Sequence, residues 1–344
     1  MSANPTVIDV TRGGMIESRH RGAVAVVRDD GKLLASLGDT SQLMYPRSSI
    51  KPLQAIQLIE SGAAEAYQLK DRQLALACAS HNGESIHVET VRRWLMQIGL
   101  NENALECGVH PPRRSEDQKA LINSNIDPSA AHNNCSGKHA GFLSSVRHLG
   151  LPSGGYIEAT HPIQQRVLSL LEDLADVSLA DVPRGIDGCG IPVAGIALQP
   201  LALSFARFAS GKGLSTERRH ASKHIYRAMV SEPTMVAGTG RWCTRAILAG
   251  KGSFIVKTGA EGVFCGAVPD AGIGIALKID DGASRASECF MGAVLSRISG
   301  LQSVFKGESE DLVRLPVLNV AGNVAGIVRP SQMLEELLDD LLQP

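Results

Sequence analysis

Short apolar stretches near both ends of the chain predict β-strands. Residues 23–28 and 33–37 are rich in β-branched and apolar side chains, and Asp29-Asp30-Gly31-Lys32 between them is typical of a hairpin turn. Towards the other end, a possible further hairpin surrounds Gly322. Three more apolar runs, separated by turn residues, predict antiparallel strands at residues 253–257, 262–269 and 272–279.

The middle of the chain follows the helical period of 3.6 residues instead. A first helix should begin with a serine cap at Ser48 and end near Gly62, with Pro52 tolerated in its first turn. Further helices are expected at residues 86–98, 138–148, 163–174, 201–208, 216–230 and 241–248, and again at 285–298 and 332–342.

This order of elements indicates an α+β fold. Strands at both ends and helices between them mean that the N- and C-terminal segments share one antiparallel sheet, flanked by helices, with a mostly helical lobe inserted. No repeat, low-complexity tract or linker divides the chain, so we expect one compact unit over residues 1–344. Within it, residues 1–45 and 250–344 should form the sheet lobe. Residues 46–249 should form the helical lobe, which carries most of the functional residues.

Composition narrows the classes of partner. The 34 Lys and Arg against 35 Asp and Glu give a formal net charge of -1, which argues against nucleic acid and against an acidic membrane surface. The first residues lack the basic start and apolar run of a secretory signal, and no uninterrupted apolar stretch is long enough to span a bilayer. We therefore expect a cytoplasmic protein that acts on a small polar substrate. The seven cysteines are odd in number and irregularly spaced, which favours thiols over disulfides.

Ser48-Ser49-Ile50-Lys51 is a candidate catalytic motif of the form S-x-x-K. In a helix, residues three apart share a face, so the lysine amine can reach the serine hydroxyl. A lysine serves as a base when burial and nearby positive charge keep it neutral. Alone the motif is weak, because a serine at a helix start followed by a surface lysine is common.

Two later motifs strengthen the interpretation. Ser80-His81-Asn82 has the form S-x-N, and Lys257-Thr258-Gly259 is a K-T-G at the end of a predicted strand. The three motifs stand in the order found in serine β-lactamases and penicillin-binding proteins. The first opens a helix, the second lies in the helical lobe and the third lies on a strand, as that fold requires.

Longer segments resemble a narrower family. The chain from about residue 21 to residue 298 is similar to rhizobial-type L-asparaginases, which have a serine β-lactamase-like fold. The segments that carry this resemblance are RSSIKP at 47–52, CASHNGE at 78–84, HNNCSGKHAG at 132–141 and DGCG at 187–190. The resemblance implies hydrolysis of L-asparagine to L-aspartate and ammonia, and a homodimer.

The resemblance also implies roles for single residues. Ser48 matches the nucleophile and Lys51 its base, and Ser80 and Lys257 match a second pair that relays a proton to the departing ammonia. Asp187 matches a residue at the polar end of the substrate, and Arg47 and His139 are weaker candidates for substrate binding. From the mechanism, we expect the backbone N–H groups of Ser48 and Ala260 to hold the oxyanion.

The resemblance implies a zinc site as well, formed by Cys135, Lys138 and Cys189. From the residues alone, His132 or His139 would be the better nitrogen ligand, because a lysine must first lose its proton to bind metal. The activated serine already supplies a nucleophile, so zinc is expected to support binding or hold loops. The role of Cys243 stays open.

Three alternatives remain at this stage. The motifs also suit a β-lactamase or a cell-wall peptidase, although those substrates lie outside the expected compartment. A serine-dependent glutaminase is the main alternative, because one methylene changes discrimination by only about 1–3 kcal/mol. A non-catalytic zinc-binding scaffold would explain the cysteines but not the two Ser-Lys pairs.

Overall fold

The computed structural model describes residues 3–341, and the chain divides into two compact units. Unit 1 contains residues 1–49, 196–212 and 245–344, and unit 2 contains residues 50–195 and 213–244. Residues 196–212, which lie within the predicted helical lobe at 46–249, therefore belong to unit 1.

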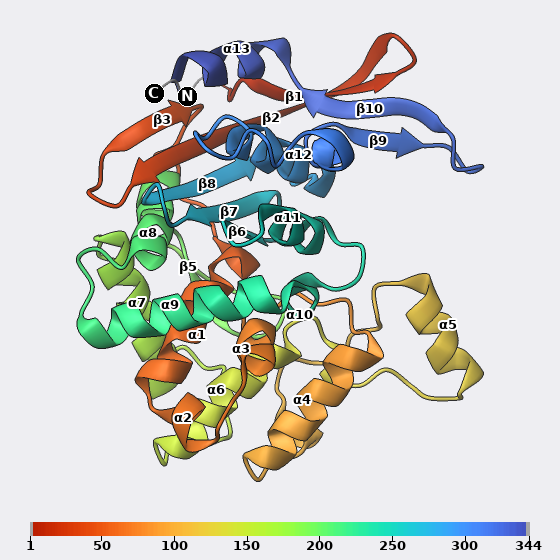
Figure 1. Ribbon diagram of the computed structural model, residues 1–344. Coiled ribbons are helices and arrows are strands. Elements are labelled where there is room, and N and C mark those ends of the chain that lie inside the picture. The colour runs from red at the N-terminus through yellow and green to blue at the C-terminus, as the bar shows by residue number, and fades with distance from the viewer. Residues whose placement is uncertain (1–2, 342–344) are drawn as a thin grey trace. The chain divides into compact units, whose positions relative to one another are not determined.

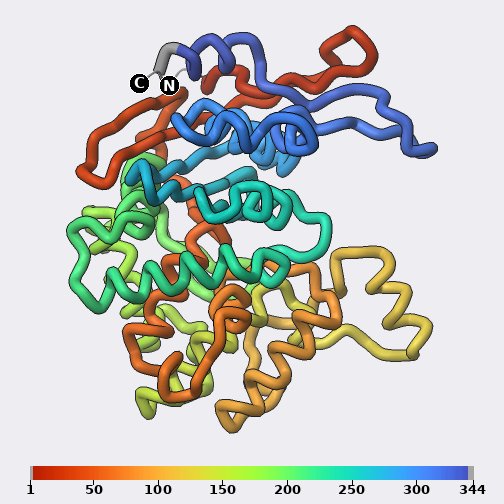
Figure 2. Tube along the Cα trace, in the orientation of Figure 1, coloured from red at the N-terminus to blue at the C-terminus, as the bar shows by residue number. Residues whose placement is uncertain are grey.

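Unit 1 is built on an antiparallel sheet of eight strands in the order β6-β7-β8-β2-β1-β10-β9, with β3 also paired to β2. Ile8 lies opposite Pro330, so strands from near both ends of the chain lie side by side, as predicted (Figures 1 and 2). The predicted hairpins and the C-terminal trio are confirmed, whereas β1 was not predicted. The strands are β1 (Thr6–Arg12), β2 (Met15–Arg28), β3 (Leu33–Leu37), β6 (Ile255–Thr258), β7 (Val263–Val268), β8 (Ile273–Ile279), β9 (Leu315–Leu318) and β10 (Val324–Pro330).

Helices cover both faces of this sheet. Helix α8 (Leu198–Ser210) packs on β8, β2 and β7, and α12 (Ser284–Leu295) packs on β7, β8, β10 and β1. A Cβ at Gly274 would meet α8, whereas a Cβ at Gly266 would meet Met291 of α12. Gly266 pairs with Ile275, the neighbour of Gly274, so the two helices lie on opposite faces. Helix α13 (Gln332–Leu341) packs on β1, and the last predicted helical residue, 342, lies outside the described residues.

Unit 2 is mostly helical and is organised around α1 (Lys51–Glu60), which packs against α9, α6 and α7. All residues of α1 from Lys51 to Leu58 are buried, which explains its nearly continuous run of apolar and amide side chains. The other elements are α2 (Ala63–Ala66), α3 (Asp71–Ala77), α4 (Ser85–Gln97), α5 (Ser115–Asn123), α6 (Ser136–His148), α7 (Pro162–Ala175), α9 (Thr216–Ser231), α10 (Pro233–Ala237) and the two-stranded pair β4 (Arg184–Ile186) and β5 (Pro192–Ala194). Helix α11 (Trp242–Gly250) crosses the boundary between the units.

The predicted start of the first helix was wrong in one respect. A 3-10 turn, η1 (Arg47–Ile50), precedes α1, and Ile50 occupies the N-cap position without a side-chain hydrogen bond. The Ser49 hydroxyl does not cap the helix, because it donates to the carbonyl of Pro46 at 2.6 Å. Pro52 does lie in the first turn, as predicted.

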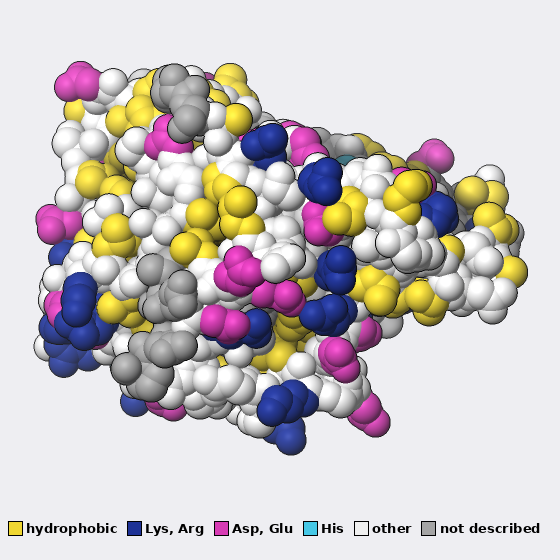
Figure 3. Space-filling view, turned by 90° about the horizontal axis from the view of Figure 1, so that it is seen from above, with side chains coloured by type: hydrophobic (Ala, Val, Ile, Leu, Met, Phe, Trp, Pro, Cys, Tyr) yellow, Lys and Arg dark blue, Asp and Glu magenta, His cyan; other side chains and the backbone are white. Residues whose placement is uncertain are grey.

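The surface agrees with the near-neutral composition. On the face shown in Figure 3, acidic and basic side chains are interspersed rather than gathered into a field of one sign. Over the described range 3–341, none of the helices combines the length and apolar character needed to cross a bilayer.

The contact between Gly274 and α8 allows a test of this packing. A Cβ at Gly274 would lie 1.9 Å from the carbonyl oxygen of Ala202 and 2.4 Å from the amide nitrogen of Ala206. We expect Gly274→Ala to lower the free energy of unfolding by about 3 kcal/mol or more, because the helix backbone must move away from the sheet. Gly14→Ala is the control, since a Cβ there has no neighbour within 4 Å. Equal stability of the two variants in urea titrations would contradict the packing described here.

Candidate active site

Helix α1 buries the amine of Lys51. The side chain is only 1% exposed, and its Nζ donates to Ala79 O at 2.5 Å, to Ser80 Oγ at 3.1 Å and to Cys135 Sγ at 3.2 Å. Three different segments of unit 2 therefore meet at one amine. Ser80 was expected to work with Lys257, and its contact with Lys51 was not predicted.

Ser80 lies in the loop that follows α3. Its side chain is half-buried, and its backbone N–H donates to the carbonyl of Val236 at 3.0 Å. This bond fixes the loop to α10, so the hydroxyl faces Lys51 from a held backbone.

Cys135, Lys138 and Cys189 also come together, as the resemblance implied. Cys135 directly precedes α6, Lys138 lies in its first turn, and Cys189 lies in the turn between β4 and β5. The Nζ of Lys138 donates to Cys189 Sγ at 2.9 Å, and the thiol of Cys189 donates to Cys135. All three side chains are buried, and all seven cysteines of the chain are free thiols, as predicted.

The electrostatics of this cluster favour the thiolate form of Cys135 over that of Cys189. The hydrogen bond from Cys189 and the charges of Lys51 and Lys138 outweigh burial and hold the pKa of Cys135 well below its usual value. The pKa of Cys189 is raised by its hydrogen bond to Cys135 and by burial. Burial alone would lower the pKa of Lys138, but the neighbouring Cys189 and Cys135 raise it, so this amine is held as an ammonium.

The two further residues expected near the substrate in unit 2 differ in environment. Asp187 opens the turn that carries Cys189, and its side chain accepts from the N–H of Gly188 at 2.8 Å while remaining half-buried. His139 is fully buried, its Nδ1 lies 2.7 Å from the hydroxyl of Tyr156, and burial holds its pKa well below the usual value.

The predicted nucleophile lies in a segment of unit 1. Arg47 has a φ of +51°, a conformation that costs a non-glycine residue about 1–3 kcal/mol and is concentrated at functional sites. The two serines after it differ. Ser49 is 0% exposed and its hydroxyl is bonded to Pro46, whereas Ser48 is half-buried.

The K-T-G motif lies against this same segment. Lys257 is buried near the end of β6, and its Nζ donates to Thr258 O at 2.8 Å. A Cβ at Gly259 would lie 3.0 Å from Pro46 O, so the glycine allows the close approach. Ala260, the expected oxyanion residue, follows in the half-buried turn to β7.

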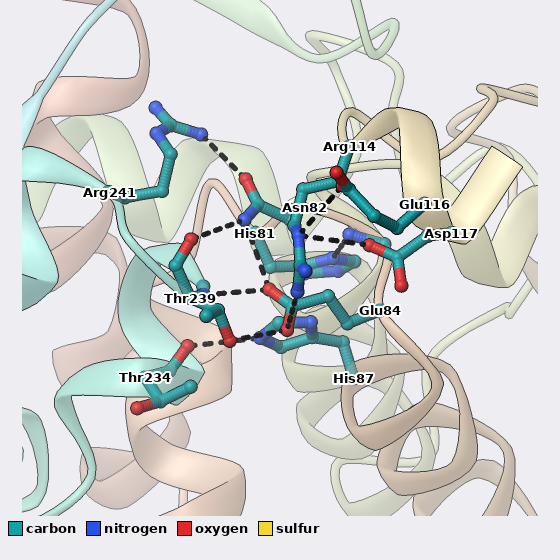
Figure 4. A network of polar contacts seen from close by, with 12 residues as sticks. His81, Asn82, Glu84, His87, Arg114, Glu116, Asp117, Thr234, Thr239 and Arg241 are labelled. Carbon is teal, nitrogen blue, oxygen red and sulfur yellow. Dashed lines mark hydrogen bonds and ion pairs between the residues drawn. The ribbon is translucent and has the colours of Figure 1, made fainter. Parts of the chain in front are cut away.

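The structure also reveals a polar network around the S-x-N motif that sequence reasoning missed. Figure 4 shows Asn82 between Glu84, Thr239 and Arg241, with Arg114 beside the Glu84 carboxylate. Glu84 stands two residues after the motif and accepts from Asn82, but its other partners, Thr239 and Arg114, are distant in sequence. The only local signal of this network in the sequence was an acidic residue two positions after the motif.

Comparisons with known proteins identify the family of the chain. A family model described as L-asparaginase II matches residues 8–330. A search of curated proteins found no match.

Several solved structures are similar at low identity. The native form of Mglu is 15% identical with a TM-score of 0.43, over 78% of this chain and 63% of that one, so this chain spans less than two thirds of it. A β-lactamase from Mycobacterium bovis is 17% identical with a TM-score of 0.37, over 76% of this chain and 88% of the other. A β-lactamase/D-alanine carboxypeptidase from Pseudomonas syringae is 11% identical with a TM-score of 0.38, over 76% and 89% respectively. Since the family match extends over nearly the whole chain, the protein belongs to the L-asparaginase II family.

Proposed function

We propose that this protein hydrolyses L-asparagine to L-aspartate and ammonia, with Ser48 as the nucleophile. The observation that carries the proposal is the contrast between the two serines of the S-x-x-K motif. The Ser49 hydroxyl is fully buried and committed to Pro46. Ser48 is half-buried and directly follows the strained backbone of Arg47. Ser48 is therefore the hydroxyl left for chemistry.

In this mechanism Lys51 accepts the proton of Ser48 while the serine oxygen attacks the side-chain amide carbon of asparagine. The N–H groups of Ser48 and Ala260 hold the oxyanion. The C–N bond then breaks, ammonia leaves with a proton supplied through Ser80 and Lys257, and an aspartyl ester of Ser48 remains. Water hydrolyses this ester by the reverse proton path and restores the serine. The 3.1 Å contact between Lys51 and Ser80 supports a connection between the two proton carriers.

Arg47, Asp187 and His139 are proposed to serve the substrate. Asp187 is half-buried and suits the ammonium group of an amino acid by charge, and Arg47 suits its carboxylate. His139 is fully buried, so its contribution is to hold the start of α6 through Tyr156.

The cluster of Cys135, Lys138 and Cys189 fits a zinc ion. Two sulfurs and one nitrogen converge on one another, and thiolate and neutral nitrogen are zinc donors. The described residues contain no group of three or more His, Cys, Asp or Glu side chains that could hold a metal, so a zinc site here needs the lysine as its third ligand. Bound zinc would supply a Lewis acid near the substrate, while the residues of the chain carry the proton transfers. A homodimer is proposed from the family resemblance, and a cytoplasmic location remains a prediction from the sequence.

The central test is ammonia release from L-asparagine and L-glutamine, measured side by side at several substrate concentrations. We expect turnover of asparagine with a higher kcat/KM than glutamine. A preference for glutamine would make the protein a glutaminase. No release from either substrate would favour the non-catalytic scaffold.

The nucleophile can be tested with two neighbouring variants. Ser48→Ala should fold normally and lose essentially all amidase activity, because no acyl-enzyme forms. Ser49→Ala should remain substantially active, because its hydroxyl is buried and donates to Pro46. Circular dichroism checks the fold and steady-state kinetics the activity. An inactive Ser49→Ala beside an active Ser48→Ala would reverse the assignment.

Zinc should tune binding rather than turnover. Lys138 and the thiols must lose their protons to bind metal, so zinc affinity should fall as pH is lowered, and the raised pKa of Lys138 strengthens this dependence. After chelation at mildly acidic pH, the enzyme should keep measurable kcat while the apparent KM for asparagine rises. Zinc content and kinetics are measured on the same sample at neutral pH. Complete loss of turnover that zinc restores would make the metal part of the chemistry, and absence of zinc from untreated protein would remove the site.

A further inference from the structure

Glu84 carries a buried carboxylate that receives four hydrogen bonds or ion-pair contacts (Figure 4). The side chain belongs to a residue that is 8% exposed, at the N-cap position of α4, yet it does not cap that helix. Its Oε1 accepts from Asn82 Nδ2 at 3.0 Å and from the N–H of Thr239 at 2.8 Å. Its Oε2 accepts from Thr239 Oγ1 at 2.6 Å and from the Arg114 guanidinium at 3.2 Å.

These contacts fix the side chain of Asn82. Its amide nitrogen also donates to the carbonyl of Thr239 at 3.3 Å, so both amide protons are used within unit 2. Its Oδ1 accepts from Arg241 at 3.2 Å. Gly238 packs directly on this amide with a φ of +113°, and a Cβ there would lie 2.5 Å from the Asn82 nitrogen. Asn82, the third residue of the S-x-N motif, therefore links its own loop to the segment that contains Thr239 and Arg241.

The network fastens the loop that carries Ser80. One end of the loop is held by the bond from Ser80 N–H to Val236, and the other end by Glu84 and Asn82 on Thr239. The segments 80–84 and 236–239 are thus joined at both ends. In this loop, which is held at both ends, the Ser80 hydroxyl lies 3.1 Å from the Lys51 amine.

The link between these two segments depends on an ionised Glu84 carboxylate. Burial would raise the pKa of Glu84, but the hydrogen bonds from the Thr239 hydroxyl and N–H and from Asn82 outweigh it and lower that pKa. The titratable groups that face it are Arg114, His87 and Asp117, and Arg114 also contacts Glu116. A glutamine amide has the same shape but presents N–H groups in place of one oxygen, so it can accept either from Asn82 and the Thr239 N–H or from the Thr239 hydroxyl and Arg114, but not from all four donors.

We propose that Glu84 is a positioning residue that holds Ser80 in place to deliver a proton to the departing amine. The proposal rests on the proposed function, because it assigns Glu84 to the step in which ammonia leaves. Glu84 itself does not touch the substrate. Glu84 acts on the reaction through the loop that carries Ser80. Its loss should therefore slow only those substrates whose leaving group needs a proton.

The experiment compares two substrates that form the same aspartyl ester of Ser48. L-Asparagine must expel an amine, which requires protonation, whereas the β-methyl ester of L-aspartate expels an alcohol far more readily without it. We expect Glu84→Gln to lower kcat/KM for asparagine by about 100-fold, the scale of one general-acid contribution. The value for the methyl ester should fall by no more than a few-fold. Because both are measured on one sample, their ratio does not depend on the fraction of folded enzyme.

Glu60→Gln is the matched control. Glu60 is also a partly buried carboxylate of unit 2 paired with an arginine, at 2.7 Å from Arg218 Nε, but it lies at the far end of α1 from Lys51. Its ratio of the two kcat/KM values should equal that of the wild type. Thr239→Val removes one donor to Glu84 and should shift the ratio in the same direction as Glu84→Gln, by less.

The outcomes separate this inference from the proposed function. A wild-type protein that does not hydrolyse asparagine overturns both. If the wild type is active but Glu84→Gln slows the amide and the ester equally, or slows neither, the proposed function stands and the role of Glu84 is overturned. A selective loss on the amide, absent from Glu60→Gln, supports the role.

Discussion

The burial of three lysine amines is the constraint on which the candidate site depends. Lys51, Lys138 and Lys257 are each 3% exposed or less. An ammonium group removed from water is strongly destabilising unless hydrogen-bond acceptors or anions surround it. The chain supplies them as the Ala79 carbonyl and Cys135 for Lys51, Cys189 for Lys138 and the Thr258 carbonyl for Lys257. Each lysine amine meets its acceptors only when the unit that contains it is folded. Folding of each unit therefore positions the lysines proposed to act in the site.

Local patterns in the sequence predicted most of the regular elements, whereas the grouping of Cys135, Lys138 and Cys189 came from the family resemblance. The strands β6, β7 and β8 are short apolar runs between turns, and their fully buried faces leave a clear signal. Strand β1 was missed because Thr6–Arg12 mixes polar and apolar residues, and its place is fixed only by pairing with β2 and β10. Helix α3 was missed because its apolar stretch Leu74–Ala77 is too short to reveal a period.

What the sequence left open in the site follows from long-range contacts. That Ser80 lies against Lys51, and Cys135 against the same amine, depends on packing between segments far apart in the chain. Nothing near Glu84 in sequence indicates that Thr239 and Arg114 would converge on it. The boundary between the units falls between Ser49 and Ile50, within the S-x-x-K motif itself. A four-residue pattern therefore carried residues of both units.

The pairing of β1 with β10 has a consequence for synthesis of the chain. The helical unit is complete once residue 244 has left the ribosome, whereas the sheet lacks β10 until residue 330 has been added. Strands β1, β2 and β3 are made first and pair with one another, but the edges of β1 and β2 that face β10 and β8 stay unpaired until those strands have been made. Nascent chains should therefore acquire protease-resistant helical structure early and sheet structure only near release. Between these two events the unpaired strand edges are the part of the nascent chain most open to pairing with other chains.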